Sequence, residues 1–226
     1  MNLIIFDCDG TIVDSQAGIV LSMDHAFRSL HMTPPSRAQT LSVVGLSLPE
    51  AFSVLAPEAE YETRRDLAER YKSAFRDLNH DPADSDGLFP DAKIVIDALA
   101  LRTDLVLGIA TGKSRRGVER LIETEGWHGV FQTIQTADEH PSKPHPSMIH
   151  RAMAETGIGP EATIMVGDTT YDIGMARAAG VGALGVTWGY HHRDELDEAG
   201  AHAIIEAYAA LPDAIAEMLV QLSRST

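Results

Sequence analysis

The sequence predicts an α/β fold in which a doubly wound parallel sheet carries a small inserted α-helical domain. Short, continuous apolar runs alternate with segments whose apolar residues recur every three or four positions. A continuous apolar run is typical of a strand buried on both faces, as in a parallel sheet. Strands that alternate with helices indicate right-handed crossovers and helices on both faces of the sheet. A long helical stretch without a strand follows the first apolar run and predicts the inserted domain.

Four apolar runs are expected to form the core strands. The first lies close to the N-terminus, and each of the others follows a segment with helical periodicity. The expected strands are residues 3–6, 105–110, 164–166 and 183–186. The expected helices of the core are residues 92–101, 117–122, 148–154, 173–179 and 214–222.

The inserted domain is expected at residues 15–82, which show helical patterns and no convincing strand. Its apolar faces are marked by Ile19, Met23, Phe27 and Leu30 on one helix, and by Leu67, Tyr71 and Phe75 on another. Residues 81–87 have the composition of a linker. We therefore expect a core of residues 1–14 and 83–226, interrupted by a helical domain of residues 15–82.

Charge and cysteine content exclude several classes of function. Lysine and arginine number 18 against 33 acidic residues, which gives a formal net charge of −15. Such a balance argues against non-specific binding to nucleic acid or to an anionic membrane. No apolar run approaches the roughly 18 residues of a membrane span, and residues 3–6 are too short for a signal peptide. Because Cys8 is the single cysteine, no internal disulfide can form, and a cytoplasmic location is expected.

Polar residues gather where the expected strands end. They are Asp7 and Asp9 after the first strand, Thr111 and Gly112 after the second, Lys143 in a later loop, and Asp168 and Asp172 after the third. In open α/β sheets, ligands bind beyond the carboxyl ends of the strands. The fold should therefore bring carboxylates, a hydroxyl group and an amine to one edge.

This combination of groups suits phosphoryl transfer. Carboxylates repel a phosphate dianion, by about 4 kcal/mol per unit-charge pair at about 4 Å and an effective dielectric constant of about 20. A hard cation removes that repulsion, and Mg²⁺ favours a few carboxylates, phosphate oxygens and water. One carboxylate can then attack phosphorus, and a second can protonate the leaving alkoxide and later deprotonate water. The amine of Lys143, with Thr111 and the Gly112 amide, adds donors for the phosphoryl oxygens.

The order of these motifs resembles the haloacid dehalogenase superfamily of Mg²⁺-dependent phosphatases. The motifs are Asp-x-Asp-Gly-Thr from Asp7, Thr-Gly from Thr111, Lys-Pro at Lys143 and Gly-Asp-x-x-x-Asp from Gly167. The resemblance covers nearly the whole core, and it implies a Rossmann-like sheet. It also implies that the inserted helical domain is a cap that closes over the ligand and contributes specificity residues.

The resemblance further implies a role for each residue of the site. Asp7 would be the nucleophile that forms an aspartyl-phosphate, and Asp9 the general acid and base. The Mg²⁺ ligands would be Asp7, the backbone carbonyl of Asp9, and Asp168, with Asp172 as a further acid near the metal. The phosphoryl group would be held by Thr111, Gly112 and Lys143.

Finer details are similar to the phosphoglycolate phosphatase branch. They are residues 9–15 (Asp-Gly-Thr-Ile-Val-Asp-Ser), residues 45–47 (Gly-Leu-Ser) in the cap, and residues 166–172. This likeness implies a small, carboxylated phosphate ester, with 2-phosphoglycolate as the first substrate to try. The dehalogenases proper lack the second acid of the first motif, so Asp9 favours a phosphatase.

Two other functions remain open. A phosphosugar mutase of the same superfamily uses the same site but returns the phosphoryl group to its substrate. A catalytically silent phosphate-binding protein is the other alternative, although binding alone needs no general acid such as Asp9. The expected partner is a small phosphorylated metabolite, with no nucleic acid or membrane, and the expected assembly is a monomer or a homodimer.

Several neighbouring residues have two interpretations. Cys8 is expected to be a small buried hydrophobe rather than a catalytic thiol. Lys113, Arg115 and Arg116 either add positive potential beside Thr111 or form an ordinary charged start of a helix. His191 is expected to lie, with the adjacent His192, in a polar loop rather than in a metal site.

Overall fold

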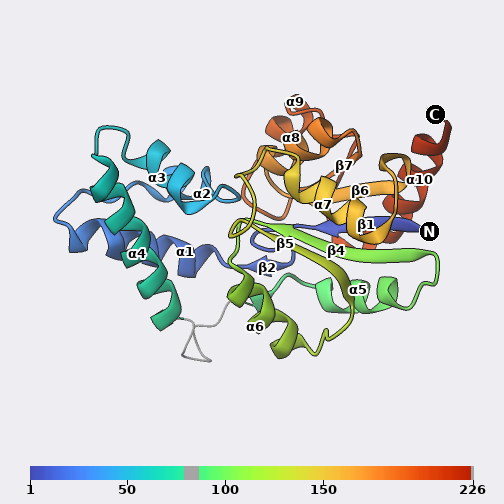
Figure 1. Ribbon diagram of the computed structural model, residues 1–226, viewed down its shortest axis with the longest axis horizontal. Helices are drawn as coiled ribbons and strands as arrows, with labels where there is room; N and C mark the ends of the chain where they lie inside the picture. The colour runs from blue at the N-terminus through green and yellow to red at the C-terminus, as the bar shows by residue number, and fades with distance from the viewer. Residues whose placement is uncertain (79–86, 225–226) are drawn as a thin grey trace.

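The computed structural model describes residues 1–78 and 87–224. Its core is a six-stranded sheet of order β5-β4-β1-β6-β7-β8, in which every neighbouring pair runs parallel (Figure 1). The strands are β1 (Asn2–Phe6), β4 (Leu105–Thr111), β5 (Phe131–Thr136), β6 (Thr163–Gly167), β7 (Gly182–Val186) and β8 (Ala203–Ile205). The predicted parallel α/β fold is therefore confirmed.

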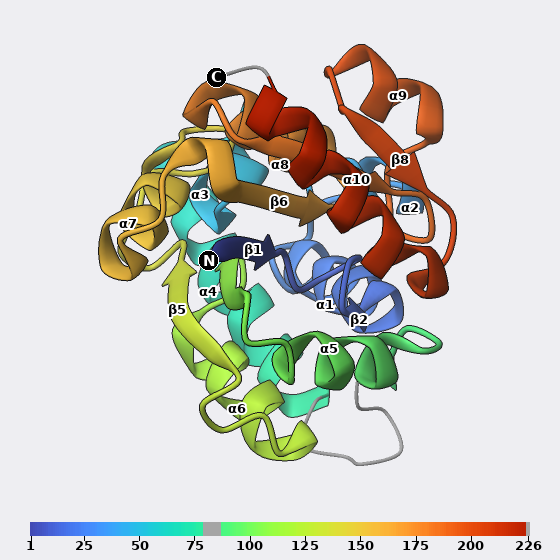
Figure 2. The same cartoon turned by 90° about the vertical axis from the view of Figure 1, so that its right-hand side faces the viewer.

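Helices cover both faces of this sheet (Figure 2). One face packs on α5 (Ala92–Ala100), α6 (Arg115–Glu125) and α10 (Leu211–Arg224), and the other on α7 (Ser147–Thr156), α8 (Thr170–Ala179) and α9 (Arg193–Glu198). Ile4 and Phe6 of β1 enter the first layer, whereas Leu3 and Ile5 enter the second. Because alternate side chains are buried on opposite faces, this strand is apolar at every one of these positions.

The structure contains two core strands that the sequence did not predict, β5 and β8. Both lie at an edge of the sheet. Short 3₁₀ helices precede β6 (Pro160–Ala162) and α10 (Tyr208–Ala210). The five expected core helices are all present. The largest differences are at α6, which begins two residues earlier and ends three later than residues 117–122, and at α10, which begins three earlier and ends two later than residues 214–222.

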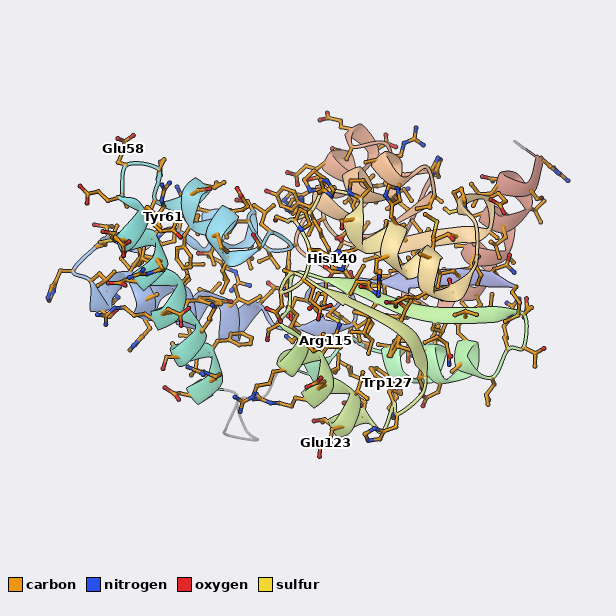
Figure 3. The ribbon with its side chains drawn as sticks, in the orientation of Figure 1. Glu58, Tyr61, Arg115, Glu123, Trp127 and His140 are labelled. Carbon is orange, nitrogen blue, oxygen red and sulfur yellow. The ribbon has the colours of Figure 1, made fainter. Side chains whose placement is uncertain are left out.

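Four helices form the inserted domain beyond the carboxyl ends of the strands (Figure 1). They are α1 (Gln16–Ser29), α2 (Arg37–Leu41), α3 (Leu48–Leu55) and α4 (Tyr61–Leu78). The predicted faces are buried here, since Met23 and Phe27 of α1 pack with Phe52 of α3 and Leu67 of α4. Glu58 and Tyr61 lie at the end of this domain that is far from the sheet (Figure 3).

The helical domain joins the core through a small antiparallel ribbon. Strand β2 (Val13–Asp14) precedes α1 and pairs with β3 (Gly87–Leu88), which precedes α5. The expected boundary between residues 82 and 83 lies outside the described residues, as does most of the expected linker. The division into a core and a cap of residues 15–82 therefore stays a prediction. None of the helices in the described ranges has the length and apolarity needed to cross a bilayer.

Candidate active site

Four chain segments meet at the carboxyl edge of the sheet. Asp7 directly follows β1, Thr111 is the last residue of β4, Asp168 directly follows β6, and Lys143 lies in the loop between β5 and α7. These side chains and that of Asp172 in α8 are each no more than 1% exposed. The structure thus brings these five predicted site residues together in the protein interior.

The ammonium group of Lys143 bridges two buried carboxylates. Its Nζ lies 2.9 Å from Asp7 Oδ1 and 2.6 Å from Asp172 Oδ1. The other oxygen of Asp172 accepts hydrogen bonds from the amide (3.1 Å) and hydroxyl (2.7 Å) of Thr169 at the start of α8. Burial lowers the pKa of Lys143, but the carboxylates of Asp172 and Asp7 outweigh it, so the pKa is above its usual value. Lys143 is therefore a permanent cation.

Asp7 offers an oxygen atom without a well-aligned donor. Although Lys143 Nζ is 2.9 Å away, Oδ1 of Asp7 makes no hydrogen bond of good geometry within the described part of the chain. Burial raises the pKa of Asp7 to about 6, with Asp172 adding to the rise and Lys143 opposing it. A buried carboxylate oxygen with a free lone pair can act as a nucleophile or as a metal ligand.

Asp168 is held by the loops that follow β1 and β7. The hydroxyl of Thr11 donates to Oδ1 at 2.8 Å, and the backbone amide of Tyr190 donates to Oδ2 at 2.9 Å. A Cβ atom on Gly10 would lie 2.2 Å from Oδ2 of Asp168, and one on Gly189 would lie 2.3 Å from its Cβ. Burial raises the pKa of Asp168 well above its usual value, and the charges of Asp172 and Asp7 add to the rise.

These carboxylates fit a divalent metal ion. Asp7, Asp168 and Asp172 each offer an oxygen within 4.8 Å of the others. Hard oxygen donors are the ligands that Mg²⁺ and Ca²⁺ prefer. Asp7 Oδ1 lacks an aligned donor among the described residues, and burial raises the pKa of both Asp7 and Asp168, so a bound cation would favour the charged form of each carboxylate.

The carboxylate of Asp9 lies outside this group of three and has its own partners. Its Oδ1 accepts hydrogen bonds from Ser15 Oγ and from Lys113 Nζ, both at 2.7 Å. Ser15 Oγ is also 3.0 Å from the hydroxyl of Tyr190. A metal-ligand role for Asp9, expected through its backbone carbonyl, stays a prediction.

The helical domain reaches the site through the loop between α2 and α3. A Cβ atom on Gly112 would lie 3.0 Å from the carbonyl oxygen of Gly45 and 3.1 Å from that of Leu46. The amide of Ser47 donates to Ser142 Oγ at 2.8 Å, beside Lys143. A side chain at position 112 would collide with this loop, so a glycine is needed there. Gly112 therefore allows the contact between the domains, in addition to its predicted role in holding the phosphoryl group.

The sequence did not single out Thr11, Ser15 or Tyr190. Thr11 stands inside the first motif, so its position was a usable signal. Ser15 ends the segment of residues 9–15 that resembles the phosphoglycolate phosphatase branch, but that resemblance gave it no role. Tyr190 acts on Asp168 through its backbone amide, for which the residue type carries no signal.

The structure shows the surroundings of Cys8, Lys113, Arg115 and His191, for which the sequence allowed two interpretations. Cys8 is buried in the same apolar cluster as Ile4 and Phe6, as expected, and burial raises the pKa of its thiol. Arg115 donates to the carbonyl oxygen of Ile134 in β5 at 2.8 Å, whereas Lys113 faces the site. His191 Nδ1 accepts from the amide of Thr170 at 3.2 Å and is not part of the metal cluster.

Comparison with known proteins identifies the family of this chain. Residues 4–186 match the model of the haloacid dehalogenase-like hydrolases. The chain belongs to this family. Among its relatives is "Probable phosphatase IndB" of Dickeya dadantii, 37% identical over 99% of this chain and 96% of that protein. The pyrophosphatase PpaX of Bacillus pumilus is 31% identical over 83% and 84% of the two chains. A phosphoglycolate phosphatase of Vibrio vulnificus is 27% identical over 98% and 94%.

A solved structure agrees on the fold. The crystal structure of a hydrolase from Pseudomonas syringae has a TM-score of 0.85 and covers 96% of this chain and 99% of its own, at 23% identity. The family match and the relatives together support the predicted enzyme class, a hydrolase acting on phosphoric monoesters.

Proposed function

We propose that this hydrolase is a Mg²⁺-dependent phosphatase that cleaves a small phosphate monoester through an aspartyl-phosphate on Asp7. The observation that carries the proposal is the environment of Asp7 Oδ1. This oxygen is buried, lacks an aligned hydrogen bond, lies 2.9 Å from the Lys143 ammonium, and belongs to a cluster of three carboxylates that fits a metal. A nucleophile, a fixed cation and a metal site in one place are what phosphoryl transfer requires.

Each residue has a distinct part in the proposed reaction. A carboxylate oxygen of Asp7 forms the bond to phosphorus, while Lys143, Thr111 and the amide of Gly112 hold the equatorial oxygens. Bound by Asp7, Asp168 and the backbone carbonyl of Asp9, with Asp172 close by, Mg²⁺ supplies the positive charge that allows a phosphate dianion to approach. Asp9 gives its proton to the leaving alkoxide and later takes one from the attacking water.

The proposed substrate is 2-phosphoglycolate or a similar phosphorylated acid. The relatives that are phosphoglycolate phosphatases support this choice. A small leaving group also suits a cap loop that passes as close to Gly112 as Gly45 and Leu46 do. Inorganic pyrophosphate is the second candidate, because PpaX proteins match at 31% identity. We further propose that residues 15–82 form the closing cap.

We also propose that the enzyme works in the cytoplasm on a free metabolite, as a monomer or homodimer. A net charge of −15 disfavours nucleic acid and anionic membranes as partners. The single cysteine, Cys8, is buried and unpaired, which suits a reducing compartment.

The test is phosphate release from a panel of small esters, with Mg²⁺ and with a chelator. The decisive pair is 2-phosphoglycolate and 2-hydroxyethyl phosphate, which share the scissile bond but differ in the carboxylate. Pyrophosphate and a sugar phosphate complete the panel. We expect Mg²⁺-dependent release, fastest from 2-phosphoglycolate, and none from the Asp7→Asn variant.

Other outcomes of this test would indicate a different function or a different mechanism. Isomerisation of the sugar phosphate without phosphate release would mean a mutase. Saturable binding of phosphate esters with no turnover over hours would mean a silent binding protein. Release that is independent of Mg²⁺, or that survives in Asp7→Asn, would remove the mechanism.

A further inference from the structure

Within residues 1–78 and 87–224, the side-chain hydrogen bonds of Asp9 are all made by one carboxylate oxygen, Oδ1. Its Oδ1 accepts from Lys113 Nζ and from Ser15 Oγ, each at 2.7 Å. The side chains of Lys113 and Asp9 are 12% and 15% exposed, so the ion pair is largely shielded from solvent. Charge-assisted hydrogen bonds of this length are strong, and a shielded one is screened little by salt.

We propose that Lys113 is a positioning residue for Asp9, which holds one carboxylate oxygen so that the other is presented to the leaving group. This inference rests on the proposed function, in which Asp9 is the general acid and base. The torsion that turns a carboxylate is broad and roughly two-fold, so an unrestrained carboxylate samples many orientations. Two donors on a single oxygen remove that freedom, and holding a reacting group in position lowers the barrier.

Lys113 is itself well anchored for this task. It follows Thr111 and Gly112 at the end of β4, and its backbone amide donates to Thr111 Oγ1 at 3.1 Å. A Cβ atom on Gly117 would lie 2.9 Å from its Cγ, so the stem packs on the first turn of α6. Its Nζ lies 5.3 Å from the ring centroid of Phe75 in α4 of the cap, within cation–π range. The ammonium group therefore contacts both domains while it holds Asp9.

Loss of Lys113 should affect the cleavage of alkyl and aryl phosphate esters differently. As the Asp7 oxygen bonds to phosphorus, the bond from phosphorus to the leaving oxygen breaks, and an alkoxide takes the proton of Asp9. A p-nitrophenolate leaves as a stable anion and needs no such proton. In the second step, water loses a proton to Asp9 as it attacks phosphorus and releases Asp7. Lys113 transfers no proton in either step, so its effect on the two chemical steps should pass through Asp9.

The experiment compares kcat/KM for 2-phosphoglycolate and p-nitrophenyl phosphate, because kcat/KM reports the steps up to departure of the leaving group. In Lys113→Gln we expect a fall of about 30-fold for the alkyl ester and less than about threefold for the aryl ester. Lys113→Arg should recover part of the loss. Arg116→Gln is the matched control, since it removes an exposed cation from the same helix start and should leave both values unchanged.

A double-mutant cycle completes the test. If Lys113 acts only through Asp9, Lys113→Gln has no further effect in an Asp9→Asn background. Equal losses on both esters, or additive losses in the cycle, would overturn the inference and make Lys113 a direct phosphate-binding or merely structural residue. Lys113→Met keeps the apolar stem and replaces Lys113→Gln if that variant does not fold. Failure of the wild-type protein to release phosphate from either ester would instead refute the proposed function.

Discussion

The Nζ atom of Lys143 lies 2.9 Å from Oδ1 of Asp7, and both side chains are at most 2% exposed. The two residues are far apart in sequence and meet because Asp7 directly follows β1, while Lys143 lies in the loop that leads from β5 to α7. A buried charge is costly unless it is paired. The pair is therefore part of the stability of the core as well as of the proposed chemistry.

Loss of the Lys143 ammonium should destabilise the protein strongly. In Lys143→Met, Asp7 and Asp172 keep their burial and lose their cation, so we expect the free energy of unfolding to fall by about 3–5 kcal/mol. Urea unfolding in the presence of a chelator measures it. Lys72→Met is the control, because Lys72 pairs with Glu69 on the exposed face of α4, and it should cost less than about 1 kcal/mol. Equal losses in the two variants would contradict the importance of the buried pair.

Gly10 should matter through its contact with Asp168. A methyl group at Gly10 meets the Asp168 carboxylate, whereas one at Gly129 meets nothing within 4 Å, and both glycines have positive φ (86° and 78°). Alanine at either position should therefore cost about 1–2 kcal/mol of backbone strain. Only Gly10→Ala should also raise the Mg²⁺ concentration needed for half-maximal activity. Unchanged Mg²⁺ dependence in Gly10→Ala would show that Asp168 is not a metal ligand or that it shifts freely.

Binding of a divalent cation should stabilise the folded protein measurably. Mg²⁺ at about 100 times its dissociation constant should add about 2.7 kcal/mol to the free energy of unfolding. Calorimetry of the chelated protein, with and without Mg²⁺, gives this difference as a shift in Tm. Asp168→Asn should lose most of the shift, while Asp213→Asn on α10, which is not part of the cluster, should keep it. A full shift in Asp168→Asn would rule out the proposed ligand set.

His140 should make the stability depend on pH. His140 lies in the same loop as Lys143, between β5 and α7 (Figure 3). Its ring bridges Ser147 Oγ (2.8 Å) and Gln135 Oε1 (2.9 Å), and burial lowers its pKa below 6.5. The unfolded chain therefore takes up a proton before the folded one. The stability present above pH 6.5 is lost as the pH falls through the lowered value.

Urea midpoints at about pH 7.5 and about pH 5.5 test this expectation. The midpoint of His140→Gln should fall less between these pH values than that of the wild-type protein. His25→Gln changes an exposed histidine of α1 and should fall as much as the wild type. An unaltered pH dependence in His140→Gln would mean that the half-buried His140 ring does not control proton uptake.

The sequence predicted those strands that are buried on both faces and missed those at the edges. In β5, Gln132 is exposed and Thr133 and Gln135 are buried polar residues that bond to Glu155 of α7, so the strand lacks an apolar run. In β8 only three residues pair with β7. Edge strands have one neighbour and are often short or polar, which removes the signal that identified β1 and β4.

The site was predictable as a set of residue types and not as a network. Motif spacing indicated Asp7, Lys143 and Asp168, and parallel strands necessarily bring their ends together. The choice of Lys113 rather than Arg115 as the partner of Asp9 depends on side-chain direction, which spacing does not give. Contacts made by backbone atoms, such as the Tyr190 amide on Asp168, are independent of residue type and left no trace in the sequence.

The central claim is that the side chain of Asp7 carries the phosphoryl group during turnover. The direct measurement is acid quenching within the first turnover with the preferred substrate, followed by mass-spectrometric peptide mapping. The account predicts a phosphoryl adduct on Asp7 that forms before phosphate is released and is absent from Asp7→Asn. Phosphate release without any adduct at the quench times, or an adduct on a different residue, would contradict it.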